Sequence, residues 1–497
     1  MKRFLLASLM GMLIGQLAFG ADIKGQIGAD DIKRGEGTFT RRTSTGGTIT
    51  LDKLNAGNLP VNYGTANDSY ASTGTVPFSV NDALSTWVDV RAYRAVGDNT
   101  ADDTEEIQAA IDAVEAVGYG IIYFPPGTYK ITTGLTVNSN GVVLRGAGKG
   151  ISKIHAVYTG TTPAIKFIGI ASARLDYAGI EGLTVYTTTG TAPDYGIHID
   201  YSAYFKAYDV EVSYFRKRAF DLRTVWQADF DHIFLFQNGR DSASTDGTLS
   251  LTSSSVVAGQ CTQSTFSNIQ LGSNFGTNIY SVNASGNSSI NFFNLALEDD
   301  PSENATSDNN AIINISNNTD LHIVNFTFTA NTKPLAASKT IFQMTGPNWS
   351  RGVYLVNGTF GANGNDTATL TSMIDWDTAQ GELELTNVMF SDYYEKIPVN
   401  KFINVTTGGL SKIRMNGVGF FTSKTLTQYF SDTTMLQGTF WRELGGTVTY
   451  YSLGNWSAAP GSKTEACISG MYAKDASYLY WCYGDNTWRR TGYDNTW

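Results

Sequence analysis

The 497-residue chain is poor in charged residues, in cysteine and in the motifs that mark common enzyme chemistries. Charged residues make up only 16% of it, whereas aromatic residues reach 12% and Gly, Ser, Thr and Asn are abundant. This balance excludes a coiled coil and a disordered chain. No Cys/His spacing suits zinc, no Gly-rich loop suits a phosphate, and no Gly-x-Ser-x-Gly motif supplies a nucleophile. The composition therefore favours a β-rich, exported protein without a cofactor.

The formal net charge of −10 excludes long-range attraction to nucleic acid or to an anionic membrane. It also disfavours the capture of a highly charged polyuronate from a distance. One local exception is the basic run Arg216-Lys217-Arg218, with Arg223 nearby.

A single apolar run, Phe4–Phe19, follows Met1-Lys2-Arg3 and is typical of a signal peptide cleaved after Gly20. It is short for a membrane span, and no other segment is long and apolar enough. We therefore expect a secreted protein, extracellular or at the cell surface, without stable membrane insertion. In that compartment Cys467 and Cys482 are predicted to form a disulfide. Cys261 is then left as a buried thiol.

Residues 103–117 have the pattern of an amphipathic helix. Asp103 and Glu106 are spaced as a capping box, and Gly118 is placed to end the helix. The apolar stripe follows the i, i+3, i+4, i+7 spacing of one helical face; it comprises Ile107, Ala110, Ile111 and Val114.

A strand, a turn and a second strand follow: the apolar run Ile121–Phe124 is broken by Pro125-Pro126-Gly127. Residues 95–131 as a whole resemble the opening motif of the pectate-lyase-like right-handed β-helix superfamily, except that Asn99 replaces a usual Gly. The resemblance implies an all-β, right-handed parallel β-helix whose N-terminal end is capped by the helix. It says little about reaction, because this fold carries lyases, hydrolases, tailspikes and binding proteins.

A repeat runs from about residue 175 to 420: a turn residue followed by apolar, any, apolar. It recurs at intervals of roughly 30 residues, within the 20–50 range of solenoid repeats. The turn residues are Gly182, Asp209, His232, Asn268, Asn294, Asn325, Asn357, Asn387 and, more loosely, Asn416. Asn tolerates the left-handed conformation that a tight corner needs, and stacked Asn amides can hydrogen-bond from coil to coil. The repeat therefore predicts a solenoid with an Asn ladder.

In β-helices that this chain resembles, the first strand of each coil forms the floor of a lateral groove. Counting onward from the corners gives eight such floor strands, most with alternating apolar and polar residues. They are residues 196–201, 219–224, 248–252, 278–282, 311–315, 340–344, 373–377 and 402–405.

Alternation places His198 and Asp200 on the outer face of the first floor strand, and Asp221 and Arg223 on that of the next. In that register His198 faces Asp221, Asp200 faces Arg223, and the two carboxylates are diagonal neighbours about 7–8 Å apart. Such a pair suits the general acid and base of an inverting glycosidase. In a lyase, Arg223 or His198 would abstract the proton next to a sugar carboxylate that Arg218 neutralises. The structural alternative is a solvated ladder of ion pairs.

Two other acidic sets lie along the predicted groove. Glu298 is expected in a loop at its edge, and Asp375, Trp376 and Asp377 lie on a floor strand about five coils beyond the first. These residues are predicted to bind another part of a long substrate.

Four regions are predicted: a signal peptide (1–20), an extended segment with weak hairpins (21–80), the β-helix (81–460) and a small aromatic-rich module (461–497). The last resembles C-terminal modules of some phage tail and secreted repeat proteins; it suits either a hydrophobic oligomerisation cap or stacking on sugar rings.

The predicted function is a secreted enzyme that binds an extended polysaccharide in the lateral groove and cleaves its glycosidic bonds. Hydrolysis is slightly preferred to elimination, because pairable carboxylates are present and the Asp cluster of calcium-dependent pectate lyases is not evident. A lyase would be compatible with Ca²⁺. The Gly-His-Gly and paired-Asp signatures of polygalacturonases are also missing. The alternative is a non-catalytic glycan-binding adhesin or a tailspike-like structural protein, which would form a homotrimer.

Overall fold

The structure is a computed structural model. It describes residues 39–42, 48–51, 86–188, 190, 192–241, 247–254, 256–275, 277–282, 287–299, 311–316, 319–330, 340–346, 352–362, 372–378, 382–391, 402–405, 412–421, 436–444, 447–453, 456–457, 472–474, 478–484 and 487–492.

The chain divides into two compact units, residues 1–87 and 88–497. In the first, β1 (Phe39–Arg42) and β2 (Thr48–Leu51) pair in antiparallel fashion. The predicted signal peptide lies outside the described residues, and the predicted boundaries at residues 20, 80 and 460 stay predictions.

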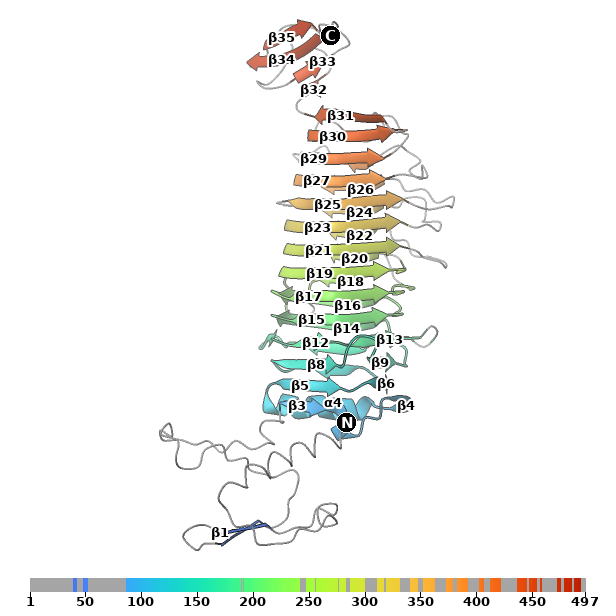
Figure 1. Cartoon of the computed structure of the whole chain (residues 1–497), viewed down its shortest axis with the longest axis vertical. Helices are drawn as coiled ribbons and strands as arrows, with labels where there is room; N and C mark the ends of the chain where they lie inside the picture. The colour runs from blue at the N-terminus through green and yellow to red at the C-terminus, as the bar shows by residue number, and fades with distance from the viewer. Residues whose placement is uncertain are drawn as a thin grey trace, which may run out of the picture. The chain divides into compact units, whose positions relative to one another are not determined.

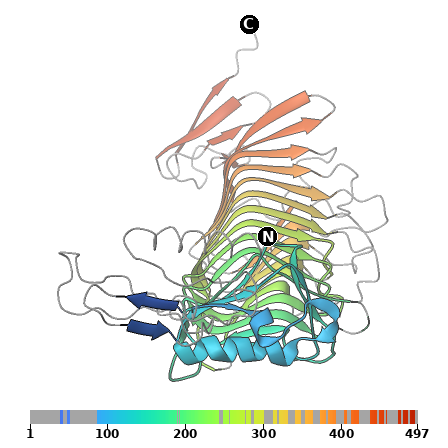
Figure 2. The ribbon, with the colours of Figure 1, turned by 60° about the horizontal axis from the view of Figure 1, so that its bottom comes forward.

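Near the start of the second unit lies the helix that the sequence predicts, α4 (Thr104–Val117). Its predicted apolar stripe is fully buried, and Gly118 ends the helix in the left-handed conformation, with φ 100°. Figure 2 shows α4 lying across the end of the stacked strands. An N-terminal capping helix is therefore present as expected.

The predicted capping box at α4 is wrong. The Asp103 carboxylate does not cap the helix but accepts hydrogen bonds from the backbone N–H groups of Val96 (2.5 Å) and Gly97 (3.1 Å). Asp102 instead accepts from the Thr104 N–H at 3.1 Å. The carboxylate of Asp103 is turned back toward the preceding turn, where it satisfies two backbone donors.

The first coils contain shorter elements, and the predicted strand–turn–strand at residues 120–131 is confirmed as β5 and β6. The elements are β3 (Trp87–Asp89), the 3-10 helix η1 (Val90–Tyr93), β4 (Asp98–Asp102), β5 (Gly120–Phe124), β6 (Gly127–Ile131), β7 (Leu135–Val137), β8 (Val142–Gly146), β9 (Ser152–Ala156), β10 (Ile165–Ile168), β11 (Leu175–Asp176), β12 (Gly179–Glu181) and β13 (Thr184–Thr187).

From β14 onward each coil contributes one floor strand and one second strand, and each pairs in parallel with its counterpart in the next coil (Figure 1). The floor strands are β14 (Tyr195–Ala203), β16 (Arg218–Trp226), β18 (Gly247–Thr252), β20 (Thr277–Val282), β22 (Ala311–Ser316), β24 (Thr340–Gly346), β26 (Ser372–Thr378) and β28 (Ile403–Val405). The second strands are β15 (Lys206–Ser213), β17 (Asp229–Phe236), β19 (Thr262–Gly272), β21 (Ser288–Asp299), β23 (Thr319–Ala330), β25 (Val353–Ala362), β27 (Glu382–Ser391) and β29 (Lys412–Phe421).

This arrangement is a parallel β-helix, and a strand lies at each of the eight positions predicted as floor strands; that they form the floor of a substrate groove stays a prediction. The stack ends with β30 (Leu436–Leu444), which is parallel to β29, and β31 (Thr447–Leu453), which is antiparallel to β30. A separate small sheet comprises β32 (Trp456–Ser457), β33 (Tyr472–Lys474), β34 (Tyr478–Gly484) and β35 (Thr487–Gly492). Cys467 and the side chain of Cys482 lie outside the described residues, so their disulfide stays a prediction.

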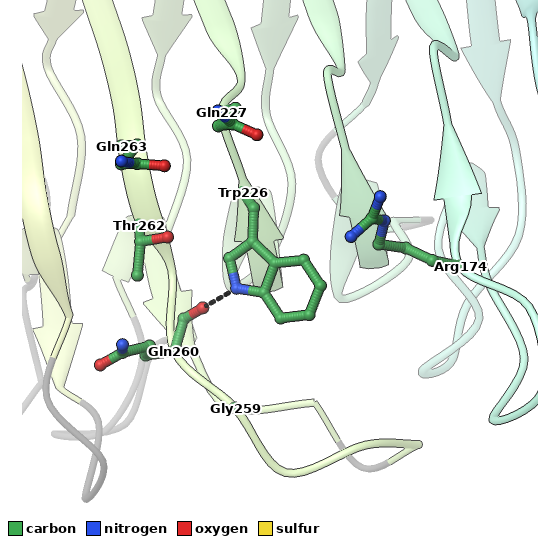
Figure 3. Close-up of a pocket in the computed structure, with 7 residues that line it drawn as sticks. All are labelled: Arg174, Trp226, Gln227, Gly259, Gln260, Thr262 and Gln263. Atoms are coloured by element: carbon green, nitrogen blue, oxygen red, sulfur yellow. Dashed lines mark hydrogen bonds between the residues drawn. The ribbon is translucent and has the colours of Figure 1, made fainter.

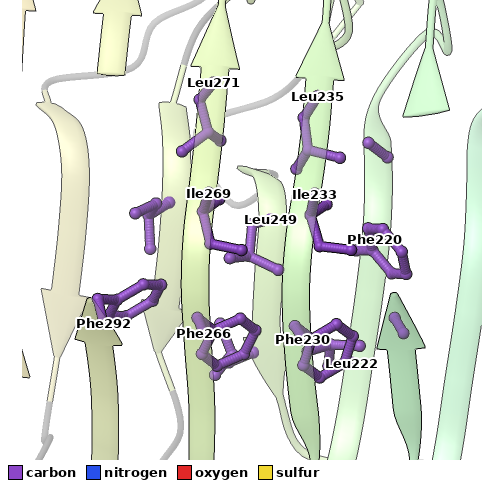
Figure 4. Close-up of a cluster of buried hydrophobic side chains, with 14 of the residues drawn as sticks. Phe220, Leu222, Phe230, Ile233, Leu235, Leu249, Phe266, Ile269, Leu271 and Phe292 are labelled. Carbon is purple, nitrogen blue, oxygen red and sulfur yellow. The ribbon is translucent and has the colours of Figure 1, made fainter. Parts of the chain in front are cut away.

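The interior of the coils is filled by aligned apolar side chains, because parallel strands place equivalent residues above one another. Phe230, Phe266 and Phe292 stack with ring centroids 4.7 and 4.8 Å apart (Figure 4). Cys261 is a buried free thiol, as predicted, and burial raises its pKa to about 12.

The Asn ladder is also confirmed. Asn268, Asn294, Asn325, Asn357 and Asn387 all have φ of 53–56°. In each of the last four, Nδ2 donates to Oδ1 of the preceding Asn, at 2.9, 3.1, 3.4 and 3.2 Å. The ladder is exposed to solvent.

The last corner lies at Gly417 (φ 65°), not at Asn416 as predicted. A Cβ at position 417 would lie 2.6 Å from Asn387 Oδ1, so only glycine fits beneath the end of the ladder.

Candidate functional site

The floor strands β14 and β16 bring the predicted site residues together. The register pairs His198 with Asp221 and Asp200 with Arg223, as the sequence predicts. Ile197, Ile199, Phe220 and Leu222 point into the core and are at most 1% exposed, which places the charged residues between them on the outer face.

Asp221 is the centre of the cluster. Its Oδ1 accepts a hydrogen bond from Arg218 Nη1 at 2.7 Å. Its Oδ2 lies 2.8 Å from His198 Nδ1 and accepts from Arg223 Nε at 3.0 Å and Nη2 at 2.8 Å. Burial alone would raise the pKa of this fully buried carboxyl, but His198 and the two arginines hold its pKa well below the usual range. Asp221 is therefore a fixed negative charge.

His198 lies between the two carboxylates. Nδ1 faces Asp221, and Nε2 lies 3.5 Å from Asp200 Oδ2. Burial opposes the charged ring, yet its hydrogen bonds to Asp200 and Asp221 outweigh that effect and raise the pKa of His198. The protonated ring is thus stabilised. Its Nε2 edge faces Asp200 rather than Asp221.

Asp200 is 2% exposed, and its Oδ1 accepts no hydrogen bond from any residue that the structure describes. A buried carboxylate oxygen without a protein donor calls for an explanation, and a ligand hydroxyl is one. The side chains of Arg218 and Arg223 reach further outward and are 12% and 25% exposed.

The rest of the basic run is neutralised locally. Arg216 pairs with Asp194 at 3.3 Å and Asp241 at 2.6 Å, and Lys217 pairs with Asp194 at 3.0 Å. The cationic character of the segment is therefore concentrated at Arg218 and Arg223, beside the cluster.

The two other predicted acidic sets do not join this cluster. Glu298 lies within the long strand β21 rather than in a loop, on a different strand layer from the floor. Asp375 lies on the floor strand β26, where Asn404 Nδ2 (2.8 Å) and Gln343 Nε2 (3.4 Å) donate to its two oxygens. Asp377 pairs with Thr345 in the same sheet through its backbone, and its side chain lies outside the described residues.

The prediction that Trp376 binds substrate is wrong. Its side chain is fully buried in the core, because it occupies the inward position between Asp375 and Asp377. It is among the largest fully buried side chains and fills the coil interior.

Sequence reasoning missed a second column of left-handed corners, near the start of the second strand in successive coils. It comprises Tyr177, Tyr204, Gln227, Gln263, Ser289 and Asp320, with φ of 50–70°. The residue type changes along this column from Tyr to Gln and then to Ser and Asp, so the sequence offered no periodic signal for it.

No group of three or more His, Cys, Asp or Glu side chains in the described part of the chain could hold a metal ion. Within the same part, no helix has the length and hydropathy needed to cross a bilayer.

Comparisons with known proteins agree with the resemblance of the N-terminal block. Residues 87–168 match the family model described as "Rhamnogalacturonase A/epimerase, pectate lyase-like". Mannuronan C5-epimerase AlgE3 of Azotobacter vinelandii is 44% identical over 75 residues, which cover 14% of this chain and 4% of that protein. The chain thus spans only a small part of the length of the curated relatives it matches.

Two solved structures resemble a larger share of the chain. The ORF18 protein of Geobacillus virus E2 has a TM-score of 0.49 and 18% identity, covering 84% of this chain and 70% of its own. The surface adhesin PfbA of Streptococcus pneumoniae has a TM-score of 0.48 and 11% identity, covering 82% of this chain and 98% of its own.

Proposed function

We propose that this protein binds an acidic polysaccharide over the floor strands β14 and β16 and removes the proton next to a sugar carboxylate. The observation that carries the proposal is the cluster of His198, Asp200, Asp221, Arg218 and Arg223, built on two adjacent coils.

The local charge favours an anionic sugar. With His198 neutral, as a general base must be, Arg218 and Arg223 balance the carboxylates of Asp200 and Asp221, and of these four side chains the two arginines reach furthest outward. Charges farther away than about 8 Å are largely screened at physiological ionic strength. The positive groups that a bound sugar meets first, Arg218 and Arg223, therefore matter more at contact distance than the net charge of the whole chain.

The roles follow from the geometry. Arg218 and Arg223 pair with the sugar carboxylate and stabilise the negative charge that spreads into it when the neighbouring C–H bond breaks. Neutral His198 takes the proton on Nε2, while Asp221 fixes the ring through Nδ1. Asp200 Oδ1 accepts a hydrogen bond from a sugar hydroxyl. The resulting carbanion either expels the glycosidic oxygen from the neighbouring carbon, and this oxygen takes up a proton from water, as in a lyase, or it regains a proton from water on its opposite face, as in an epimerase.

The same geometry argues against the hydrolytic arrangement preferred from the sequence. A general acid needs a carboxyl that is protonated near working pH and free to donate. Both oxygens of Asp221 already accept hydrogen bonds from cationic groups, and its pKa is depressed. Asp221 therefore suits orientation and charge balance better than proton donation.

One observation favours a second function, non-catalytic glycan binding by an adhesin-like or tailspike-like protein. Asp221 is fully buried and Asp200 is 2% exposed. A buried ion-pair network of this kind can serve to fix the register between two coils. In that case the glycan contacts only Arg218, Arg223 and the outer edge of His198.

A polysaccharide panel tests the proposal. Mannuronan is the first choice because a relative is named a mannuronan C5-epimerase; polygalacturonate and neutral glucans complete the set. New ultraviolet absorbance identifies a lyase, solvent deuterium in the intact polymer identifies an epimerase, and reducing ends alone identify a hydrolase. Binding without any of these identifies an adhesin and contradicts the catalytic proposal. Parallel reactions with chelator and with added Ca²⁺ show whether a cation is needed.

A further inference from the structure

A pocket of about 620 Å³ lies where the floor strand β16 turns into the next strand. It is lined by Arg174, Trp226, Gln227, Gly259, Gln260, Thr262 and Gln263 (Figure 3). Its size is within the 300–1,000 Å³ typical of small-ligand sites. None of these residues belongs to the charged cluster of β14 and β16.

Trp226 lies in the middle of the pocket, between Arg174 and Gln260 (Figure 3). Its indole Nε1 donates to the Gln260 carbonyl at 2.8 Å, which fixes the ring plane. The rings of Tyr201 and Trp226 meet edge to face with centroids 5.8 Å apart, and the Arg174 guanidinium lies over the indole ring, 5.2 Å from its centroid. A half-buried indole held in one orientation favours the stacking of a ligand ring, because the Trp226 side chain loses little conformational entropy on binding.

The backbone around the pocket adopts conformations that bulky residues rarely adopt. Gln227 and Gln263, on successive coils, have φ of 50° and 52°. Tyr177 and Tyr204 precede them in the same column, with φ of 59° and 56°, and their rings stack at 4.8 Å. Left-handed conformations at such residues cost on the order of 1–3 kcal/mol each and cluster at ligand-binding sites. Of these residues, Gln227 and Gln263 line the pocket beside Trp226.

The wall of the pocket is held rigidly. Ser254 N–H donates to Thr224 Oγ1 at 2.9 Å, which ties the segment after β18 to the floor strand β16. A Cβ on Gly259 would lie 2.6 Å from Thr224 Cγ2, so the wall approaches this strand as closely as glycine allows. The pocket is therefore preorganised.

The lining suits the uncharged face of a sugar ring. Its polar groups are amides and a hydroxyl, and the single cation, Arg174, is bonded to both carboxylate oxygens of Asp176 at 2.6 and 3.0 Å. An aromatic platform with amide groups around it matches a pyranose ring, whose C–H face stacks while its hydroxyls hydrogen-bond.

We propose that this pocket is a second sugar subsite, in which the uncharged face of another ring of the glycan stacks on Trp226. The inference rests on the proposed function, since it assumes the same glycan. Trp226 lies three residues beyond Arg223 on β16, which is about 10 Å along the strand. The glycan therefore extends across the floor from the charged cluster to this corner, with its acidic group at the arginines.

The test is a binding titration of wild-type protein, Trp226→Ala, Trp226→Phe and Phe293→Ala with mannuronan oligosaccharides, by calorimetry at fixed ionic strength. Phe293 on β21 is a matched control because it is an exposed aromatic residue away from the pocket. We expect Trp226→Ala to weaken binding at least tenfold, equivalent to about 1.4 kcal/mol. Trp226→Phe should retain most of the affinity, and Phe293→Ala should match the wild type.

Failure of this inference differs from failure of the proposed function. Thermal unfolding first verifies that each variant is folded. Trp226→Ala with wild-type affinity overturns the subsite, even if His198→Gln abolishes turnover. Weakened binding by Trp226→Ala supports the subsite, even if the wild type shows no turnover. Wild-type protein that binds none of the oligosaccharides also overturns the subsite.

Discussion

Two columns of outward-facing polar residues run along this β-helix, and they obey different rules. The corner column repeats one residue type, Asn, from position 268 to 387, and each amide bonds to the next in contact with solvent. The floor column changes at every coil and is buried and charged where β14 meets β16. Its members in register are Lys166, His198, Asp221, Ser250, Tyr280, Asn314, Gln343, Asp375 and Asn404.

The contrast between the two columns distinguishes residues that stabilise the stacking of the coils from residues that could form a functional site. A residue that only stabilises stacking is equally good at every coil, so the same residue recurs. A site needs different groups at fixed separations, so neighbouring coils must differ. His198 facing Asp221, flanked by two arginines, has no equivalent in the corner column.

The largest expected effect on stability is that of Asp221→Asn. The substitution leaves the guanidinium groups of Arg218 and Arg223 facing a neutral amide inside the protein, so we expect the free energy of unfolding to fall by about 3–5 kcal/mol. Asp209→Asn is the matched change in the corner column, where the carboxylate is partly exposed and 3.5 Å from Lys149 Nζ. It should cost less than about 1 kcal/mol.

Denaturant unfolding of both variants measures the contrast. If Asp221→Asn and Asp209→Asn lowered the free energy of unfolding equally, the charged floor residue would stabilise the fold no more than its counterpart in the corner column, which would contradict the distinction.

Asn325→Leu should have an intermediate effect, about 1–3 kcal/mol of unfolding free energy. Leucine is strained at φ 56° and breaks the bonds to Asn294 and Asn357. Asn325→Gly separates the two causes, since glycine accepts the conformation and loses only the amide bonds. If thermal unfolding of Asn325→Leu matched that of the wild type, the ladder would not be a stabilising device.

The smallest expected effect is a pH dependence that only the floor column produces. The pKa of His198 is raised in the folded protein, so its contribution to stability is complete below the ordinary His range and is lost as pH rises through the folded pKa. Wild-type stability should therefore decline over that interval. The decline should be absent in His198→Gln and retained in His232→Gln, a control whose side chain is 53% exposed. Equal pH profiles for all three proteins would contradict the assignment.

The fold and part of the site could be predicted from the sequence because both follow from repetition. Asn325 and its equivalents recur in register, which fixes the coils, and alternation within the coils fixes the pairing of His198 with Asp221. Trp376 occupies an inward position in the same alternation, so its side chain points into the core. The prediction that it binds substrate together with Asp375 and Asp377 overlooked this position.

The remaining features depend on local geometry that carries no periodic signal. Which of two adjacent carboxylates, Asp102 or Asp103, faces the start of α4 is decided by the preceding turn. The corners at Gln227 and Gln263 share a backbone conformation with Tyr177 and Tyr204 but no common residue type. The pocket around Trp226 was therefore not predictable from a residue pattern.

The central claim is that the floor column carries the chemistry and the corner column does not. The most direct test uses mannuronan deuterated at the carbon next to the carboxylate and follows the release of deuterium into water, which reports elimination and epimerisation alike. His198→Gln should slow this release at least about a hundredfold, as loss of a general base does. His232→Gln, the same change in the corner column, should leave it unchanged. Release at the wild-type rate from His198→Gln, or none from the wild type, would contradict the account.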